Sequence, residues 1–170
     1  MRIRPVAEAD LPALADLARR TWLDAFGDSV TEDEAAAYVD ATRSEHYFRA
    51  ALSKDTILVA DEEEEGKLVG YVKFGDVQIP EVDAKPGDAG LHRVYVETAL
   101  QGRGIGRQLV GGALSHPRLH EASRVFLEVW EENRAAVRLY ESVGFQTVGT
   151  TRVTIGTDEV GEDLVMVLER

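Results

Sequence analysis

Cysteine is absent from this sequence of 170 residues. Without a thiol the chain has no disulfide, no thiolate metal site and no acyl-cysteine intermediate, so any acyl transfer must use another route. The sequence also lacks an apolar run long enough to span a membrane, and no basic segment followed by an apolar one stands at Met1. These absences lead us to expect a cytoplasmic protein that does not engage a membrane.

Basic side chains are few relative to acidic ones. Nineteen lysines and arginines stand against 31 aspartates and glutamates, which gives a net charge of −12. Such a chain repels nucleic acid and anionic lipid but attracts cationic molecules. We therefore expect no nucleic-acid partner, whereas a cationic substrate fits the charge balance. An acidic surface also serves solubility, so charge alone does not name the substrate.

The length predicts one domain spanning residues 1–170, because domains usually hold about 100 to 200 residues. Apolar residues make up 44% of the chain and charged residues 29%, as in ordinary globular proteins. No internal repeat or low-complexity linker divides the sequence.

The opening third is predicted to be mostly helical. An edge strand over residues 3–6 precedes a helix over 9–26, which Gly27 ends. Thr31 stands three residues before a glutamate, the capping-box pattern that begins a helix, and Ser44 is suited to cap the next one.

The rest of the chain alternates in a way that is typical of strands. Five consecutive carboxylates in residues 61–67 repel one another, so we expect a solvated hairpin turn there rather than a metal or polyamine site. Residues 80–90 are predicted to form a loop whose position suits a lid on the substrate side. The expected strands are 56–60, 68–74, 91–96, 125–130, 145–155 and 162–168, with a helix over 131–142.

Three alternating glycines follow the strand at 91–96. Gly102, Gly104 and Gly106 carry no Cβ, so their peptide N–H groups can approach a ligand closely, and a helix begins directly after them. The helix dipole adds partial positive charge, and Arg103 and Arg107 add full charges. This turn is suited to an anion, with a diphosphate as the expected guest.

Two well-known phosphate motifs do not match this turn. In a dinucleotide fingerprint the third glycine would fall on Arg107, and the phosphate-binding loop that ends in Gly-Lys-Ser/Thr lacks its lysine and hydroxyl. The alternative is a glycine-bearing helix cap without a ligand.

A second group of polar residues lies near the C-terminal third. Asn133 and Tyr140 are seven residues apart, which places an amide and a phenol on one helical face. The alternative is a structural helix in which the asparagine is the N-cap and the tyrosine packs in the core.

These two stretches together resemble the GNAT superfamily of acetyl-CoA-dependent N-acetyltransferases. The resemblance implies an α/β (α+β) fold with a mixed, mostly antiparallel sheet of six or seven strands flanked by helices. The residues that carry it are Val94-Tyr95-Val96, Gln101, Gly104, Gly106, Leu127-Glu128-Val129, Asn133, Ala136, Leu139-Tyr140 and Gly144-Phe145.

The resemblance also implies where acetyl-CoA binds. Backbone groups of Val94, Tyr95 and Val96 match the family strand that meets the pantetheine arm, and Asn133 and Tyr140 match residues near the same arm. Tyr140 further matches the usual general acid that protonates the departing thiolate. The turn that would hold the pyrophosphate comprises Gln101, Gly102, Arg103, Gly104, Ile105, Gly106 and Arg107. No metal is expected.

A general base is needed because an ammonium with a pKa near 10 must lose a proton before it attacks the thioester. Glu128 matches the position of the base in the family's ribosomal-protein alanine acetyltransferases. Many members carry another glutamate at the start of the strand before the glycine turn, where this chain has Gly90 and then His92. His92 is therefore the alternative base.

The acceptor is less defined than the donor. The chain looks most like the bacterial spermidine/spermine N-acetyltransferases in residues 129–145, in the tail residues Gly149, Gly156, Asp163-Leu164 and Met166, and in the segments 22–27 and 37–39. The expected acceptor is therefore a primary amine of a small molecule, a polyamine first, with direct transfer in a ternary complex. The alternatives are a protein N-terminus or lysine, and a non-catalytic acetyl-CoA-binding regulatory module. Homodimers are frequent in the family. Aromatic residues in the region where the family builds its acceptor pocket are Trp22, Phe26, Tyr38 and Tyr47.

Overall fold

The structure is a computed structural model that describes residues 1–62, 66–155 and 158–170. The helices are η1 (Glu8–Asp10), α1 (Leu11–Phe26), η2 (Gly27–Ser29), α2 (Glu32–Arg43), α3 (Glu45–Ala51), η3 (Thr98–Leu100), α4 (Ile105–Ser115), α5 (Pro117–His120) and α6 (Arg134–Ser142). The strands are β1 (Arg2–Pro5), β2 (Thr56–Asp61), β3 (Leu68–Gly75), β4 (Asp88–Val96), β5 (Arg124–Trp130), β6 (Gln146–Ile155) and β7 (Asp158–Glu169).

These strands form a seven-stranded sheet in the order β1-β2-β3-β4-β5-β7-β6. The pairs β1–β2, β5–β7 and β6–β7 are antiparallel, while β4 and β5 are parallel. The predicted mixed, mostly antiparallel sheet with flanking helices is confirmed. The chain divides into two compact units, residues 1–73 with 93–113 and residues 74–92 with 114–170. A single domain over residues 1–170 remains a prediction.

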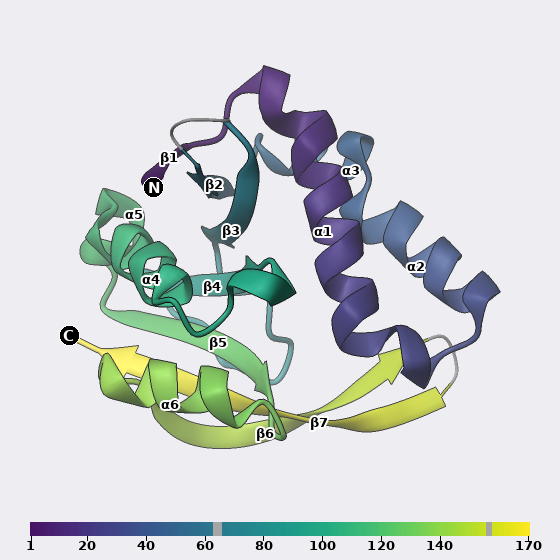
Figure 1. Ribbon diagram of the computed structural model, residues 1–170. Helices are drawn as coiled ribbons and strands as arrows, with labels where there is room; N and C mark the ends of the chain where they lie inside the picture. Colours follow the sequence, from purple (N-terminus) through teal and green to yellow (C-terminus); the bar gives the residue numbers. More distant parts are fainter. Residues whose placement is uncertain (63–65, 156–157) are drawn as a thin grey trace. The chain divides into compact units, whose positions relative to one another are not determined.

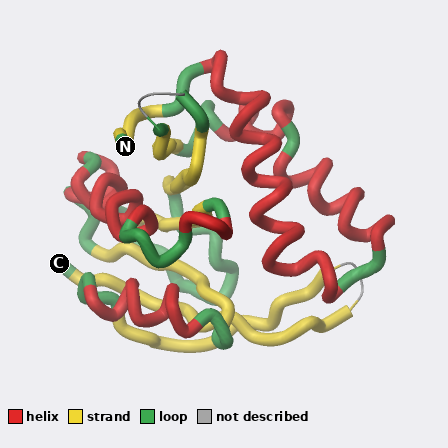
Figure 2. Tube along the Cα trace, in the orientation of Figure 1, coloured by secondary structure: helices red, strands yellow, loops and turns green. Residues whose placement is uncertain are grey.

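Helices cover both faces of the strands in the first unit. Figure 1 shows α1 and α2 side by side, and the tube in Figure 2 shows how much of this part is helical. A core cluster joins α1 and α3 to one face of β2 and β3, and α4 packs on the other face, where Leu109 meets Gly70 and Gly112 meets Leu58. The members of that cluster are Leu11, Leu14, Leu17, Ala18, Phe48, Ile57, Val59, Leu68 and Tyr71.

The predicted end of the first helix and the two predicted N-caps in this unit are confirmed. α1 ends at Phe26, directly before Gly27. The Thr31 hydroxyl accepts a hydrogen bond from the Glu34 backbone N–H while the Glu34 carboxylate accepts one from the Thr31 backbone, so the capping box forms as expected. Ser44 caps α3 through a bond from the Tyr47 backbone.

The acidic run after β2 is only partly a turn. Asp61 belongs to β2, is 1% exposed and accepts hydrogen bonds from Arg2 at 2.9 Å and Arg4 at 2.6 Å. Placing it in a solvated turn was therefore wrong, because two arginines on β1 neutralise its charge. Residues 63–65, the centre of the expected turn, lie outside the described residues.

The second unit is built on β5, β7 and β6. Gly144, with φ of 105°, follows the end of α6 as the predicted glycine cap and lies against Leu168 of β7. α6 begins at Arg134 and not at residue 131, because Asn133 is its N-cap and accepts a hydrogen bond from the Ala136 backbone at 3.1 Å.

The loop before β4 packs against β5 and β7 on the face opposite to α6. Ile79 is 7% exposed and forms a cluster with Phe126, Val165 and Val167. Residues 88–90, which we predicted as part of the loop, begin β4 instead and pair with residues 124–126 of β5. The loop therefore lies over the same face of β5 and β7 that carries Glu128, since alternate residues of a strand share a face.

Candidate acetyl-CoA and acceptor sites

The turn between β4 and α4 has the backbone that the glycines predicted. Gly102 and Gly104 have φ of 77° and 81°, a left-handed conformation that side chains disfavour. No atom lies within 4 Å of where a Cβ would stand on either residue, so the turn is open on that side. α4 begins at Ile105, whose buried side chain anchors the first helical turn.

Charge and hydrogen bonding at this turn fit a diphosphate. Arg103 and Arg107 are exposed, and the start of α4 adds its N–H groups and dipole. Gln101 ties the turn back to β4, because its Nε2 donates to the Val96 carbonyl at 3.2 Å. The turn thus combines two exposed arginines, open space beside two glycines and a helix N-terminus, which are features suited to a diphosphate.

The second half of β4, residues 93–96, belongs to the first unit and leads into this turn. Val94, Tyr95 and Val96 are all half-buried. A Cβ on the neighbouring Gly70 would stand only 2.9 Å from the Tyr95 carbonyl oxygen, so the glycine is required by the close approach of the two strands. The backbone of β4 is therefore held firmly where the sequence predicts contact with the pantetheine arm.

Glu128 lies in the middle of β5 with its carboxylate on an exposed face. It is the one exposed residue of a strand whose other members are buried or half-buried. The Thr151 hydroxyl, 6% exposed on β6, donates to Glu128 Oε1 at 2.7 Å. The carboxylate therefore has a fixed position and keeps an oxygen for another partner.

A second carboxyl group, Asp163, was missed by the sequence interpretation as a functional group. It lies on β7, opposite Trp130 of β5 and Thr151 of β6, and so on the same face as Glu128. Burial, together with the nearby charge of Glu128, raises the pKa of Asp163 to about 6. Period-two alternation along both strands could have placed the pair on one face, but only with the strand register in hand.

His92 lies at the second unit's end of β4. Its Nε2 is 2.7 Å from the Asp76 carbonyl oxygen, which can only accept, so Nε2 carries a proton and Nδ1 is the basic nitrogen. A Cβ on Gly90 would stand 3.0 Å from the His92 ring and 2.9 Å from that carbonyl. Gly90, at a place where many family members carry a glutamate, thus leaves space for the His92 ring.

α6 carries the predicted amide and phenol at its two ends. Asn133 is exposed and caps α6 with its side-chain oxygen. The N-cap role that we gave as the alternative for this residue is therefore confirmed. Tyr140 is 7% exposed, and its ring packs edge-on against Phe145 at 5.9 Å. The Asn133 side-chain nitrogen takes no part in this cap and can still donate to a ligand.

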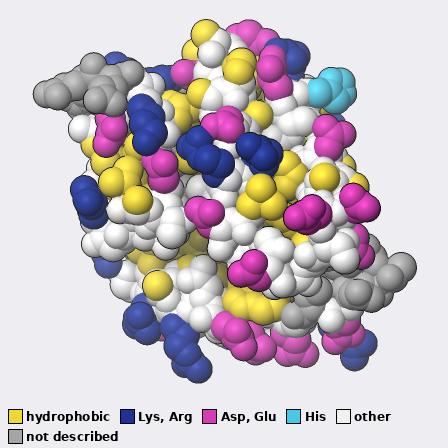
Figure 3. Space-filling view, turned by 45° about the vertical axis from the view of Figure 1, so that its right-hand side comes forward, with side chains coloured by type: hydrophobic (Ala, Val, Ile, Leu, Met, Phe, Trp, Pro, Cys, Tyr) yellow, Lys and Arg dark blue, Asp and Glu magenta, His cyan; other side chains and the backbone are white. Residues whose placement is uncertain are grey.

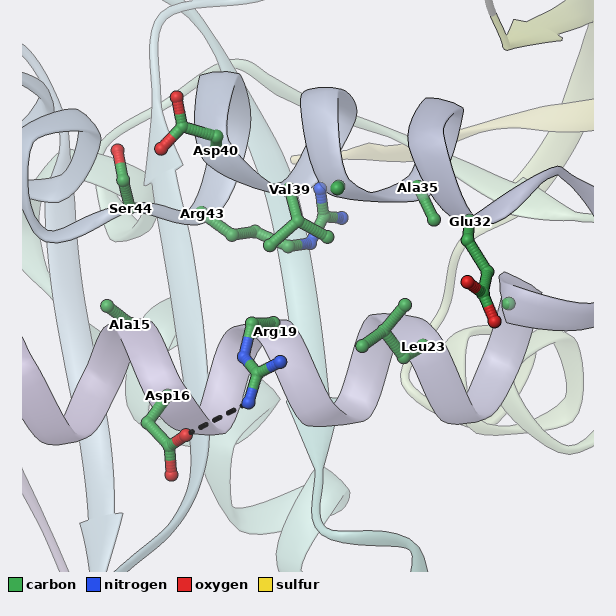
Figure 4. Close-up of a pocket in the computed structure, with 12 residues that line it drawn as sticks. Ala15, Asp16, Arg19, Leu23, Glu32, Ala35, Val39, Asp40, Arg43 and Ser44 are labelled. Carbon is green, nitrogen blue, oxygen red and sulfur yellow. Dashed lines mark ion pairs between the residues drawn. The ribbon is translucent and has the colours of Figure 1, made fainter.

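A groove of about 640 Å³ runs between α1 and α2 in the first unit. Figure 4 shows Leu23 and Arg19 reaching from α1 and Val39 from α2, with the Arg43 guanidinium behind Val39. The predicted pocket aromatics Trp22 and Tyr38 are neighbours, with ring centroids 4.9 Å apart. The groove is lined by Ala15, Asp16, Arg19, Leu23, Gly27, Glu32, Ala35, Ala36, Val39, Asp40, Arg43 and Ser44.

On the face seen in Figure 3, acidic side chains are scattered among basic and apolar ones. In residues 1–62, 66–155 and 158–170 no cluster of three His, Cys, Asp or Glu side chains could hold a metal. Over the same residues, no helix has the length and apolar character to cross a membrane.

The fold and the glycine turn define the class as an acyltransferase that takes its acyl group from a CoA thioester. The chain belongs to the acetyltransferase (GNAT) family, whose family model matches residues 11–145. It is an acetyl-CoA-dependent N-acetyltransferase.

Individual relatives are more distant. The spermine/spermidine N(1)-acetyltransferase of Bacillus subtilis is 29% identical over 133 residues, which cover 71% of this chain and 87% of the relative. The N-alpha-acetyltransferase RimI of Mycobacterium tuberculosis is 41% identical over 87 residues, 51% of each chain. The PaiA N-acetyltransferase of Thermoplasma acidophilum, solved with coenzyme A, is similar in fold with a TM-score of 0.77 and 18% identity, over 99% of this chain and 98% of that one.

Proposed function

We propose that this enzyme transfers the acetyl group of acetyl-CoA to a primary amine of a small molecule, a polyamine first, directly in a ternary complex. The observation that carries the proposal is the Glu128–Asp163 pair. Two carboxyl groups on one open strand face can hold an ammonium and accept its proton, which the amine must lose before attack.

Two further features support a cationic acceptor, and one supports direct transfer. The net charge of −12 attracts polycations. The absence of cysteine excludes an acyl-cysteine intermediate, which favours direct transfer. The relative from Bacillus subtilis, whose name gives spermine and spermidine as substrates, matches 71% of the chain.

The proposed roles follow from these positions. Glu128 is the general base, directly or through a water molecule, and the neighbouring Asp163 tunes it. Tyr140 is the general acid that returns a proton to the CoA sulfur, and Asn133 contacts the pantetheine region. The turn from Gln101 to Arg107 holds the pyrophosphate. His92 is the alternative base, with Nδ1 as the acceptor atom.

A protein N-terminus is the second candidate acceptor. The 41% identity to the RimI protein over 87 residues favours it, although that match covers half of each chain. Peptides that outcompete spermidine at equal concentration would establish this candidate. Membership of the family favours an enzyme over a non-catalytic acetyl-CoA-binding module.

The test is release of free thiol from acetyl-CoA in the presence of a panel of amines and peptides. We expect turnover with primary amines, and no thiol release with any of them would overturn the proposal. Glu128→Gln should lower kcat/KM for the amine by roughly 100-fold or more, the usual contribution of a positioned base. The matched control is Glu141→Gln, an exposed glutamate on α6, which should leave kcat/KM unchanged.

A further inference from the structure

Arg43, the last residue of α2, is a buried cation without an anionic partner. It is 3% exposed. Its Nη1 donates to the Thr42 hydroxyl at 2.7 Å, its Nη2 lies 3.4 Å from the Tyr95 hydroxyl, and its Nε has no acceptor. Among the residues that the structure describes, no carboxylate forms an ion pair with this guanidinium. A charge in this position is costly unless something compensates it.

Aromatic rings supply part of that compensation. The centre of the Arg43 guanidinium lies 5.4 Å from the Trp22 ring centroid, 5.3 Å from Tyr38 and 5.7 Å from Tyr95. Ring faces attract a cation, but they offer no lone pair to its N–H groups. The edge formed by Nε and Nη2 therefore keeps its capacity to donate.

A second guanidinium lies beside the first. Arg93 of β4 donates from Nη1 to the Thr42 carbonyl at 2.7 Å, and its guanidinium lies 5.0 Å from the Tyr47 ring centroid. Over the described part of the chain it too forms no ion pair with a carboxylate. Two cations thus meet around Thr42, which adds mutual repulsion to the cost of burial.

A neutral donor completes the cluster. Tyr71 on β3 is fully buried, stacks on Tyr95 at 5.7 Å, and its hydroxyl has no hydrogen-bond partner. Burial raises the pKa of Tyr71 to about 12, so the phenol keeps its proton at neutral pH. The cluster therefore contains donors in excess of acceptors.

This cluster is reached from the groove between α1 and α2. Arg43 is one of the residues that line that groove, and Figure 4 shows its guanidinium lying between the two helices. A small ligand that enters the groove therefore lies beside the Arg43 side chain.

We propose that the Nε–Nη2 edge of Arg43, with Arg93 beside it, binds the carboxylate of an acceptor that carries both a primary amine and a carboxylate. The two oxygens of a planar carboxylate match the two parallel N–H groups of a guanidinium edge. The inference rests on the proposed acetylation of a primary amine and concerns the other end of the acceptor. A polyamine lacks this group, so the two acceptor classes can be compared in one assay.

The position of Tyr95 limits the length of such an acceptor. Its hydroxyl meets Arg43, and its backbone belongs to the stretch of β4 that we propose for the pantetheine arm. The acceptor's two charged ends are therefore separated by about one tyrosine side chain. A linear chain of about five carbons has that reach.

Three five-carbon amines test the inference on the unmodified enzyme: 5-aminopentanoate, pentylamine and pentane-1,5-diamine. They keep one primary amine and place a carboxylate, a methyl group or an ammonium at the other end. We expect kcat/KM for 5-aminopentanoate to exceed that for pentylamine by about tenfold to 100-fold, mostly through KM. Equal values for these two amines would overturn the inference, and the value for the diamine tests the proposed preference for a polyamine.

Variants separate recognition from a structural role. Arg43→Met should remove the advantage of 5-aminopentanoate over pentylamine, and Arg43→Lys should restore part of it. A similar loss for all three amines would show that Arg43 only supports the fold. Should Arg43→Met fail to fold, Arg93→Met is read in the same way.

The outcomes also separate this inference from the proposed function. Turnover of other amines in the panel together with no preference for 5-aminopentanoate rejects only the carboxylate site. No thiol release with any primary amine rejects the proposed function, and the inference with it.

Discussion

Asp163 shows how a single residue gains chemistry from its neighbours. An aspartate on a solvated surface has a pKa well below neutral pH. Asp163, in contrast, is partly buried beside the charged Glu128, which raises its pKa. Its pKa of about 6 means that the pair holds one proton more readily than two free carboxyl groups would. Protonation of the pair therefore falls in the pH range where enzymes are assayed.

We predict that kcat/KM for the amine rises with pH through an inflection near 6, because the pair accepts a proton only after the one it holds has left. In Asp163→Asn this inflection should disappear or move to lower pH, since the remaining carboxylate no longer has a charged neighbour. The measurement is a pH–rate profile from about pH 5 to about pH 8 at saturating acetyl-CoA. An unchanged inflection in the variant would exclude Asp163 as its source.

At this scale the sequence predicts some groups and misses others for one physical reason. Glu128 was predicted as the base because the residues around it in β5 resemble the family, and its role stays a prediction. Asp163 and Arg43 were not assigned a function, because their environments depend on the register of β5 with β7 and on the packing of α2 against β4. Neither is encoded in the spacing of nearby residues.

The turn and α4 together form the element that we propose holds the donor. Gly104 has φ of 81° and directly precedes the helix, and its carbonyl accepts a hydrogen bond from the Gln108 backbone at 3.1 Å. A residue with a Cβ loses about 1–2 kcal/mol in this conformation. A side chain at residue 104 would therefore favour a different backbone conformation, in which the N–H groups turn away from the proposed position of the pyrophosphate.

We therefore predict that Gly104→Ala raises KM for acetyl-CoA about tenfold, with a smaller effect on KM for the amine. Gly111→Ala is the matched control, because it lies on the exposed side of the same helix with no atom near its Cβ position. It should leave both KM values unchanged and stabilise α4 by about 0.5–1 kcal/mol. Equal KM effects of the two changes would contradict a special role for the turn.

Element boundaries followed from the sequence where the deciding contacts are local. The caps at Thr31 and Ser44 involve residues three apart, and both were predicted. The start of β4 at Asp88 was not, because its first residues pair with a strand 36 positions away. Asp61 was placed in a turn since its partners, Arg2 and Arg4, are distant in the chain.

On the scale of the whole molecule, ion pairs and Asp163 act on stability in opposite directions. Hydrogen bonds from arginines lower the pKa of Asp10, Asp61 and Asp88 below the ordinary 3.8. These three therefore stabilise the fold above that value, and the stabilisation is lost as pH falls through their folded pKa values. Asp163 does the reverse: its raised pKa means that the folded state gains stability as pH falls from about 6 toward 3.8.

We predict that the free energy of unfolding rises slightly as pH falls from about 7 to about 4, and then drops steeply at lower pH. Because Asp163 is partly exposed, its share is about 1 kcal/mol after allowance for solvent screening. Urea unfolding at a series of pH values measures the profile. Asp163→Asn should remove the rise and keep the acid limb, whereas Asp88→Asn should lower stability at neutral pH and make the acid limb less steep. A rise that persists in Asp163→Asn would assign it to another group.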